Sequence, residues 1–272
     1  MDEWVQVNLR FLSAHKETAW ALLYQFDCIG IEEIEPDQCR AYFPPQVDAR
    51  QVLACLRGSP AVREAQAARI QSKDWHRQWM DSYHSFKVGK FFIRPRWEAV
   101  EARPEATEIV IDPKSAFGTG THATTQLCLK SLPKLLVGKR RGIDLGCGSG
   151  ILSIAARRVS PGTQVVAVDN DLQACIECLE NARINRVCFP IVCGTFASTG
   201  GFADLIVSNL ELNALVSLAP EFRVRTFPGA ILLLSGTLQD QESDLRQAYE
   251  PEFSLQEFLV QDEWLAFVYQ RR

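Results

Sequence analysis

From residue 135 to the end of the chain, apolar runs typical of strands alternate with segments of helical apolar spacing. Successive strand–helix–strand units make right-handed crossovers and build a parallel sheet. The last two β-like runs are separated only by Asp262 and Glu263, so they predict a hairpin that adds an antiparallel pair. The pattern therefore predicts an α/β fold. The strands expected before the hairpin are "RGIDLG", "QVVAVDN", "FPIVCG", "ADLIVSNL" and "GAILLLSGT".

The first 70 residues mix helix and strand signals on a smaller scale. Residues 2–12 alternate as a strand does, and residues 16–30 have helical spacing, with Gly30 as the expected C-cap. Two short strands around a turn follow, and then a second helix in "DARQVLACLRGS". We therefore predict a compact α+β domain over residues 1–70.

An aromatic stripe occupies the segment that follows this domain. Trp75, Trp79 and Tyr83 stand at positions i, i+4 and i+8, which share one face of a helix. We predict a linker helix over residues 71–86 that packs between two domains, and the alternative is a helix that recognises a substrate. The second domain then covers residues 87–272.

Charge and hydropathy exclude several classes of partner. The net charge is −4 and the isoelectric point is about 5.7, so the chain lacks the basic excess that grips a nucleic-acid backbone. No apolar run approaches membrane-spanning length, and the first residues lack the order of a secretory signal. We expect a cytoplasmic monomer without direct contacts to nucleic acid or membrane.

The nine cysteines are odd in number and scattered, which is typical of reduced apolar side chains in a cytosolic protein. Cys175 and Cys178 form the one C-x-x-C pair, on a single predicted helix. No second Cys or His pair nearby completes a zinc set, so no metal site is predicted.

A glycine cluster follows the first strand of the α/β region, in "IDLGCGSGILSIAA". Gly146 permits a sharp turn, and Gly148 and Gly150 let a ligand approach the backbone without a Cβ in the way. A nicotinamide-binding loop needs a third glycine where this chain has Ile151. The loop therefore favours a ligand without phosphates, which lays a ribose and a short amino-acid chain over it.

Two aspartates accompany the glycine loop. Asp169 ends the next strand, where a carboxylate can accept both hydroxyls of a ribose; a polar strand end is the alternative. Asp144 ends the first strand, where it either orients the loop or the ammonium group of the ligand, or has a purely structural role.

This combination of D-x-G-x-G-x-G, a following strand that ends in Asp, and a closing hairpin resembles the class I S-adenosylmethionine-dependent methyltransferases. The resemblance covers residues 110–272. It implies a Rossmann-like, seven-stranded sheet of order 3-2-1-4-5-7-6. It also implies that S-adenosylmethionine binds above the carboxyl ends of the strands.

The stretch "DPKSAFGTGTHATTQLCLKSL" resembles a narrower family, the ribosomal protein L-eleven (L11) methyltransferases, or PrmA family, whose hallmark is F-G-T-G-x-H-x-T-T. "DWHRQW", "DLIVSNL" and "DEWLAFVY" are also similar to that family. The resemblance implies transfer of methyl groups from S-adenosylmethionine to lysine side chains and N-terminal amines of L11. It further implies that the N-terminal domain, ferredoxin-like, holds this protein substrate.

The same resemblance implies roles for individual residues. Thr125, Gly146, Asp169 and Asn209 contact the cofactor. No dedicated base stands out, so we hypothesise that Asn209, nearby backbone carbonyls and His122 orient the acceptor amine while water takes its proton. The alternatives are a polar strand end for Asn209 and a structural hydrogen-bonding group for His122. Phe117 and Gly118 cover the sulfonium or the adenosine. The complete expected set of cofactor-binding residues is Phe117, Gly118, Thr125, Asp144, Gly146, Gly148, Asp169 and Asn209.

Two positions depart from the family pattern. Lys114 stands where the family commonly has Gly, and "SNLELNAL" replaces the commoner "NILAGPL". The second change puts Glu211 close to the expected acceptor entrance, where it either attracts a cationic amine or is a solvated residue at a helix start. The alternatives left open are a methyltransferase for another protein or a small molecule, and a non-catalytic S-adenosylmethionine-binding protein.

Overall fold

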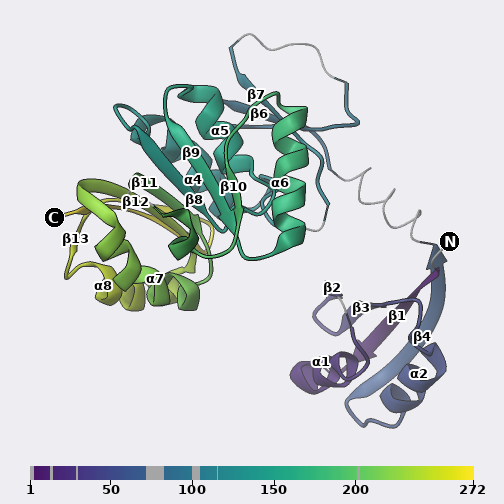
Figure 1. The fold of residues 1–272 in the computed structure, drawn as a ribbon. Helices are drawn as coiled ribbons and strands as arrows, with labels where there is room; N and C mark the ends of the chain where they lie inside the picture. Colours follow the sequence, from purple (N-terminus) through teal and green to yellow (C-terminus); the bar gives the residue numbers. More distant parts are fainter. Residues whose placement is uncertain are drawn as a thin grey trace. The chain divides into compact units, whose positions relative to one another are not determined.

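The structure is a computed structural model that describes residues 3–12, 15–28, 30–71, 83–99, 105–114, 116–200 and 203–272. It divides into two compact units, Met1–Tyr83 and His84–Arg272 (Figure 1). Most of the linker helix predicted over 71–86, including Trp75 and Trp79, lies outside the described residues.

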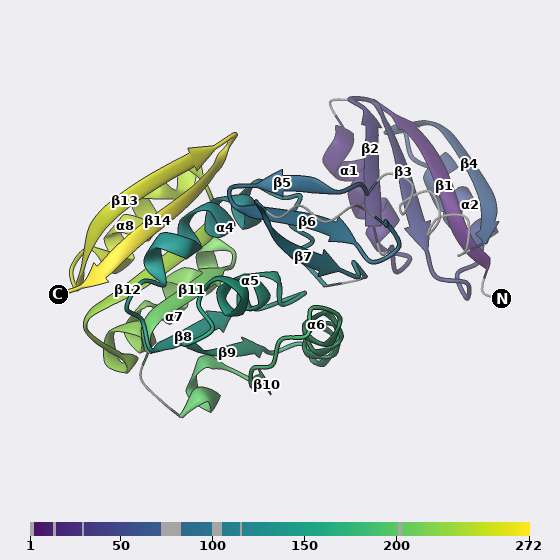
Figure 2. The ribbon, with the colours of Figure 1, turned by 90° about the horizontal axis from the view of Figure 1, so that it is seen from above.

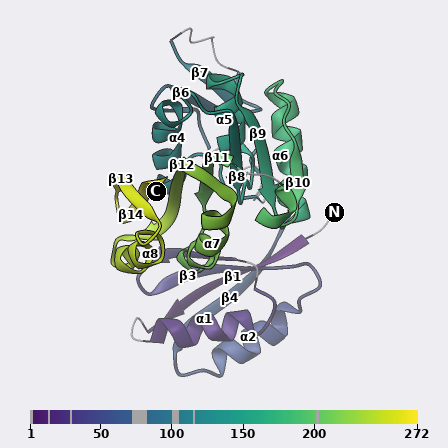
Figure 3. The same cartoon turned by 60° about the vertical axis from the view of Figure 1, so that its left-hand side comes forward.

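The N-terminal unit is a four-stranded antiparallel sheet with two helices on one face (Figure 3). Its strand order is β2-β3-β1-β4, which is the ferredoxin-like arrangement expected from the family resemblance. Apolar side chains alternate along β1, so that Val5, Val7 and Leu9 face the helices and are buried. Its elements are β1 (Glu3–Phe11), α1 (Lys16–Tyr24), β2 (Gly30–Glu35), β3 (Gln38–Phe43), α2 (Ala49–Arg57) and β4 (Val62–Gln71).

The predicted end of the first helix was wrong. Helix α1 ends at Tyr24, and Gly30 begins β2. The chain leaves the helix through a turn in which Asp27 takes a φ of 55°, a left-handed conformation that Asp tolerates better than most residues. The turn therefore needs no glycine cap.

The C-terminal unit is built on the seven-stranded sheet expected from the class I methyltransferase pattern (Figures 1 and 2). Its order is β10-β9-β8-β11-β12-β14-β13, which is 3-2-1-4-5-7-6 when its strands are numbered along the chain. All pairs are parallel except those made by β14, which confirms the predicted closing hairpin. Its strands are β8 (Arg141–Leu145), β9 (Gln164–Asp169), β10 (Ile191–Cys193), β11 (Ala203–Asn209), β12 (Thr226–Leu238), β13 (Phe253–Gln261) and β14 (Trp264–Arg271).

Helices cover both faces of this sheet, because successive side chains on its buried strands point to opposite faces. In β11, Leu205 and Val207 pack in one core while Ile206 packs in the other. The first core lies against α4 (Ala123–Leu135), α5 (Ile151–Val159) and α6 (Leu172–Ile184). The second lies against α7 (Leu212–Arg225) and α8 (Glu242–Tyr249).

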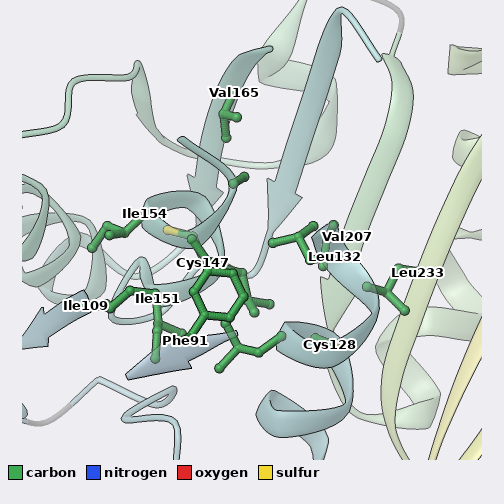
Figure 4. Close-up of a cluster of buried hydrophobic side chains, with 14 of the residues drawn as sticks. Phe91, Ile109, Cys128, Leu132, Cys147, Ile151, Ile154, Val165, Val207 and Leu233 are labelled. Atoms are coloured by element: carbon green, nitrogen blue, oxygen red, sulfur yellow. The ribbon is translucent and has the colours of Figure 1, made fainter. Parts of the chain in front are cut away.

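A small three-stranded sheet precedes the large one and leads into the first glycine-rich stretch. Its strands are β5 (Phe86–Val88), β6 (Phe91–Pro95) and β7 (Thr107–Ile111). Figure 4 shows Phe91 and Ile109 from these strands in one apolar cluster with Cys147 of the glycine loop and Ile151 of α5. The first core thus anchors the underside of the loop that carries the expected ligand contacts.

Candidate active site

A cavity of about 680 Å³ lies where the carboxyl ends of β8, β9, β11 and β12 meet. This volume is in the range of small-molecule sites, and the place is the switch point of the sheet, between β8 and β11, where the strand order reverses. Its lining comes from the ends of these strands and the loops after them, and from the loop after β10. The segment before α4 with the start of that helix, the first half of α7 and the starts of α6 and β14 complete it. Segments far apart in sequence therefore form one concave surface.

The glycine loop after β8 is tied to the end of β9 by backbone hydrogen bonds. The N–H groups of Gly146 and Cys147 donate to the carbonyl of Val168 at 2.8 and 3.0 Å. The N–H of Gly148 donates to Asp169 Oδ2 at 2.9 Å. The loop is thereby flattened over the strand ends, with Gly146 and Gly148 on the cavity wall.

The first glycine-rich stretch packs directly on the second. Ser149 donates its N–H to the carbonyl of Phe117 at 2.8 Å and its hydroxyl to the carbonyl of Gly118 at 2.6 Å. A Cβ on Gly148 would lie 2.3 Å from the Phe117 carbonyl oxygen, so only glycine permits this approach. Glu177 of α6 secures the outer end of the stretch by accepting the N–H of Ala116 at 2.9 Å. The two stretches quoted from the sequence form one structure.

Asp169 holds the loop and lines the cavity at the same time. Its Oδ2 accepts from Gly148, and its Oδ1 accepts the N–H of Asp171 at 3.0 Å. A carboxylate has about four lone-pair directions, so each oxygen retains acceptor capacity after these bonds. The backbone bonds fix the direction in which the remaining lone pairs point.

Asp144 lies beneath the loop rather than on the cavity wall. It is 3% exposed, and its Oδ2 accepts from the N–H and the hydroxyl of Ser153 at 2.9 and 2.7 Å. The N-cap of α5 is Gly150, which has no side chain to accept that N–H, so Asp144 caps the helix from the strand. Burial raises the pKa of Asp144 to about 6, against the lowering effect of the Ser153 hydrogen bonds.

The start of α4 forms another wall of the cavity. His122 is its N-cap: Nδ1 lies 2.7 Å from the Thr124 hydroxyl and accepts the Thr124 N–H at 3.4 Å. The imidazole lies between Phe117 and Trp264, with ring centroids 5.3 and 4.7 Å away and edge-to-face geometry. His122 therefore has a structural task, and it also lines the cavity.

Asn209 ends β11 and is fixed by the next turn of α4. Its Nδ2 donates to the hydroxyl of Thr125 at 3.3 Å, and Thr125 is 1% exposed. No group in the described part of the chain donates to Asn209 Oδ1 in the hydrogen bonds found. The amide carbonyl is thus the acceptor that this residue offers to the cavity.

The expected cofactor-binding residues divide into two groups. Phe117, Gly146, Gly148, Asp169 and Asn209 line the cavity, and so does His122, which was expected to orient the acceptor. Gly118, Thr125 and Asp144 lie outside that lining, and each is hydrogen-bonded to a residue of the loop, the cavity wall or α5.

Sequence reasoning missed several lining residues, including Asp171, Thr195, Gly236 and Trp264. Gly236 carried a usable signal, because it follows an apolar run as Gly146 does. Its φ is 98°, and a Cβ there would lie 2.3 Å from the carbonyl oxygen of Leu210. Trp264 carried no local signal, since its place depends on the pairing of β14 with β12.

Among the residues that the structure describes, the ionisable side chains that line the cavity are His122, Asp169, Asp171 and Glu211, and no Lys or Arg lines it. Such a cavity favours a cation and disfavours phosphate groups. In the described ranges, no cluster of three or more His, Cys, Asp and Glu side chains could hold a metal ion, and no helix is long and apolar enough to cross a membrane.

Comparisons with known proteins identify the family of this chain. The sequence model of the family described as ribosomal protein L11 methyltransferase (PrmA) matches residues 3–272. The ribosomal protein L11 methyltransferase of Syntrophotalea carbinolica is 35% identical over 85% of this chain and 80% of its own, and that of Pseudomonas putida is 32% identical over 99% of each. The crystal structure of ribosomal protein L11 methylase from Lactobacillus delbrueckii superposes with a TM-score of 0.66 at 28% identity, over 70% of this chain and all of that one. The chain belongs to the ribosomal protein L11 methyltransferase (PrmA) family.

Proposed function

We propose that this chain transfers methyl groups from S-adenosylmethionine to lysine side-chain and N-terminal amines of ribosomal protein L11. The observation that carries the proposal is the acidic cavity at the switch point, walled by both glycine-rich stretches, in a chain that belongs to this family. With a ribosomal substrate, the proposed compartment is the cytoplasm. The N-terminal unit is the proposed holder of L11.

The residues of the cavity fit S-adenosylmethionine. Asp169 has acceptor capacity left for two ribose hydroxyls, and the side-chain-free edge at Gly146 and Gly148 admits a ligand close to the backbone. The absence of Lys and Arg from the described part of the lining suits a ligand without phosphates and with a positively charged sulfur. Phe117, which is 56% exposed, would cover the ligand from above.

When bound, S-adenosylmethionine supplies a methyl group already activated for in-line displacement, so the protein contributes mainly position and electrostatics. The acceptor amine must be neutral to react, and a lysine has an ordinary pKa of about 10.4. Transfer into the half-enclosed cavity removes water from the ammonium and lowers its pKa. The carbonyl of Asn209, held by Thr125, orients the amine, and water takes the proton.

Replacing Asp169 with alanine tests the cofactor site and the function together. We expect S-adenosylhomocysteine to bind at least about 100-fold more weakly, because hydrogen bonds to a charged group contribute about 1.5–3 kcal/mol each and two would be lost, about 3–6 kcal/mol together. Calorimetry measures the affinity. Mass spectrometry of L11, incubated with protein and isotopically labelled S-adenosylmethionine, measures the methylation that the variant should lose.

The exposed carboxylate of Asp240, which does not line the cavity, provides the control variant Asp240→Ala. If the unchanged protein binds S-adenosylmethionine but methylates other proteins and not L11, the substrate assignment fails. If it binds the cofactor and methylates nothing in ribosomal protein mixtures or whole-cell extract, the non-catalytic alternative replaces the proposal.

Replacing Asn209 with alanine tests the positioning role. We expect kcat to fall about 100-fold with S-adenosylhomocysteine affinity within about threefold, since misplacing an acceptor by about 1 Å costs a rate of this order. Thr125→Val, which removes the hydroxyl that holds Asn209, should lower kcat about tenfold, while Thr125→Ser keeps that hydroxyl and should be near normal. Unchanged turnover in Asn209→Ala would exclude the role.

A further inference from the structure

We propose that Glu211 is a specificity-determining residue whose carboxylate draws cationic acceptors into the cavity beside Asn209. The inference rests on the proposed function, methyl transfer to an amine. Glu211 lines the cavity and is exposed, so it stands on the solvent side of the site. It is two residues from Asn209, which offers its carbonyl to the acceptor.

The backbone that carries Glu211 is held from both sides. The N–H of Leu210 donates to the carbonyl of Ser235 at 3.0 Å. On one side, a Cβ at Gly236 would lie 2.3 Å from the Leu210 carbonyl oxygen; on the other, a Cβ at Gly146 would lie 2.4 Å from Leu210 Cδ2. The two glycines let the loop after β11 pack tightly, so the position of the Glu211 backbone is fixed relative to the cavity.

The carboxylate of Glu211 has no structural task in the described residues. Glu211 is the N-cap of α7, yet its side chain accepts no hydrogen bond from the first turn. Glutamate is longer than the Asp, Asn, Ser and Thr side chains that cap helices well. No ion pair found among the described side chains involves Glu211. The acceptor capacity of the carboxylate is therefore not used by the described residues and is available to a ligand in the cavity.

The charges around Glu211 favour a cation over an anion. The other ionisable residues of the described lining are His122, Asp169 and Asp171, and none of the described lining residues is Lys or Arg. The acceptor amine is an ammonium ion before it enters, whereas a neutral or acidic acceptor would gain nothing from Glu211. Because the residue is exposed, we expect an effect of about fivefold, the upper part of the range for exposed ion pairs.

The experiment compares Glu211→Gln with the unchanged protein in methylation of purified L11. We expect the KM for L11 to rise about fivefold, kcat to stay within about twofold, and the affinity for S-adenosylhomocysteine to stay unchanged. The KM of the unchanged protein should rise with salt, and that of the variant should rise less, because salt screens the attraction. Asp244→Asn is the matched control: it removes one exposed carboxylate at the start of α8, outside the cavity.

A KM unchanged in Glu211→Gln, or raised equally by Asp244→Asn, overturns the inference. If the unchanged protein does not methylate L11, the proposal that L11 is the substrate fails. The attraction of cationic acceptors by Glu211 is then tested by a binding measurement. In equilibrium dialysis with the S-adenosylhomocysteine-loaded protein, Nα-acetyl-lysine methylamide should bind about fivefold more weakly to the variant. Equal binding, or no binding to either protein, also overturns the inference.

Discussion

Replacing Gly148 with alanine is expected to abolish measurable binding of S-adenosylhomocysteine and to destabilise the C-terminal unit by about 2–5 kcal/mol. The new Cβ would lie 2.3 Å from the carbonyl oxygen of Phe117, a backbone atom that cannot turn aside. Overpacking of this kind costs about 1–3 kcal/mol, and an L-residue at a φ of 50° adds about 1–2 kcal/mol. Relief requires the two glycine-rich stretches to separate, and they form adjacent walls of the cavity.

The matched control is Gly138→Ala. Gly138 also has a left-handed φ, 73°, but no atom lies within 4 Å of the position of an added Cβ. This variant should therefore show only the backbone cost, about 1–2 kcal/mol, with normal ligand affinity. Denaturant unfolding and calorimetry measure the two quantities. Ligand affinity in Gly148→Ala within about threefold of the unchanged protein would show that contact between the stretches does not shape the site.

The architecture was predictable because the buried strands of the large sheet carry strong local signals. Each is a short apolar run with turn residues after it, and the spacing to the next run leaves room for a helix. Strand β4 shows the opposite case. In "VREAQAARIQ" the side chains that face the helices are small, Ala65 and Ala67 among them, so the alternation is weak. The sequence predicted no strand there, although β4 pairs with β1 along its whole length.

The site was predictable where short local segments determine the positions of its residues. The glycine loop and Asp169 come from consecutive strands of the sheet, and the hydrogen bond from Gly148 to Asp169 joins them as the order of these strands requires. Trp264 and Thr195 line the same cavity from β14 and from the loop after β10. Their places depend on long-range strand pairing and loop packing, which residue patterns do not encode.

The sequence identified Asp144 as a residue of the site, but its role could be assigned only from the fold. Both a ligand contact and a structural role were open, and its distance from the cavity wall could not be inferred from its position at the end of a strand. The structure buries it under the loop, where it caps α5. Burial of a carboxylate has a thermodynamic consequence that can be measured.

Because burial raises the pKa of Asp144 from the usual 3.8 to about 6, the folded state prefers the protonated acid. Between about pH 4 and pH 6 the folded chain holds a proton that the unfolded chain releases, so this residue makes the free energy of unfolding fall as pH rises. The difference of about 2 pKa units corresponds to about 3 kcal/mol, all of it lost above pH 6. Asp144→Asn is neutral at every pH and can still accept from Ser153, so it should escape this loss.

We therefore compare the free energies of unfolding of Asp144→Asn and the unchanged protein. The value for the variant minus that for the unchanged protein should rise by about 3 kcal/mol as the pH increases from 4 to 8. Any fixed cost of the new amide cancels in this comparison, as do the titrations of other groups. Ser153→Ala should act in the opposite direction, because it removes a hydrogen bond that favours the charged carboxylate. Denaturant unfolding at a series of pH values measures all three proteins. Parallel pH profiles for Asp144→Asn and the unchanged chain would mean that the carboxylate is charged in the fold without cost, and that its role under the loop is purely geometric.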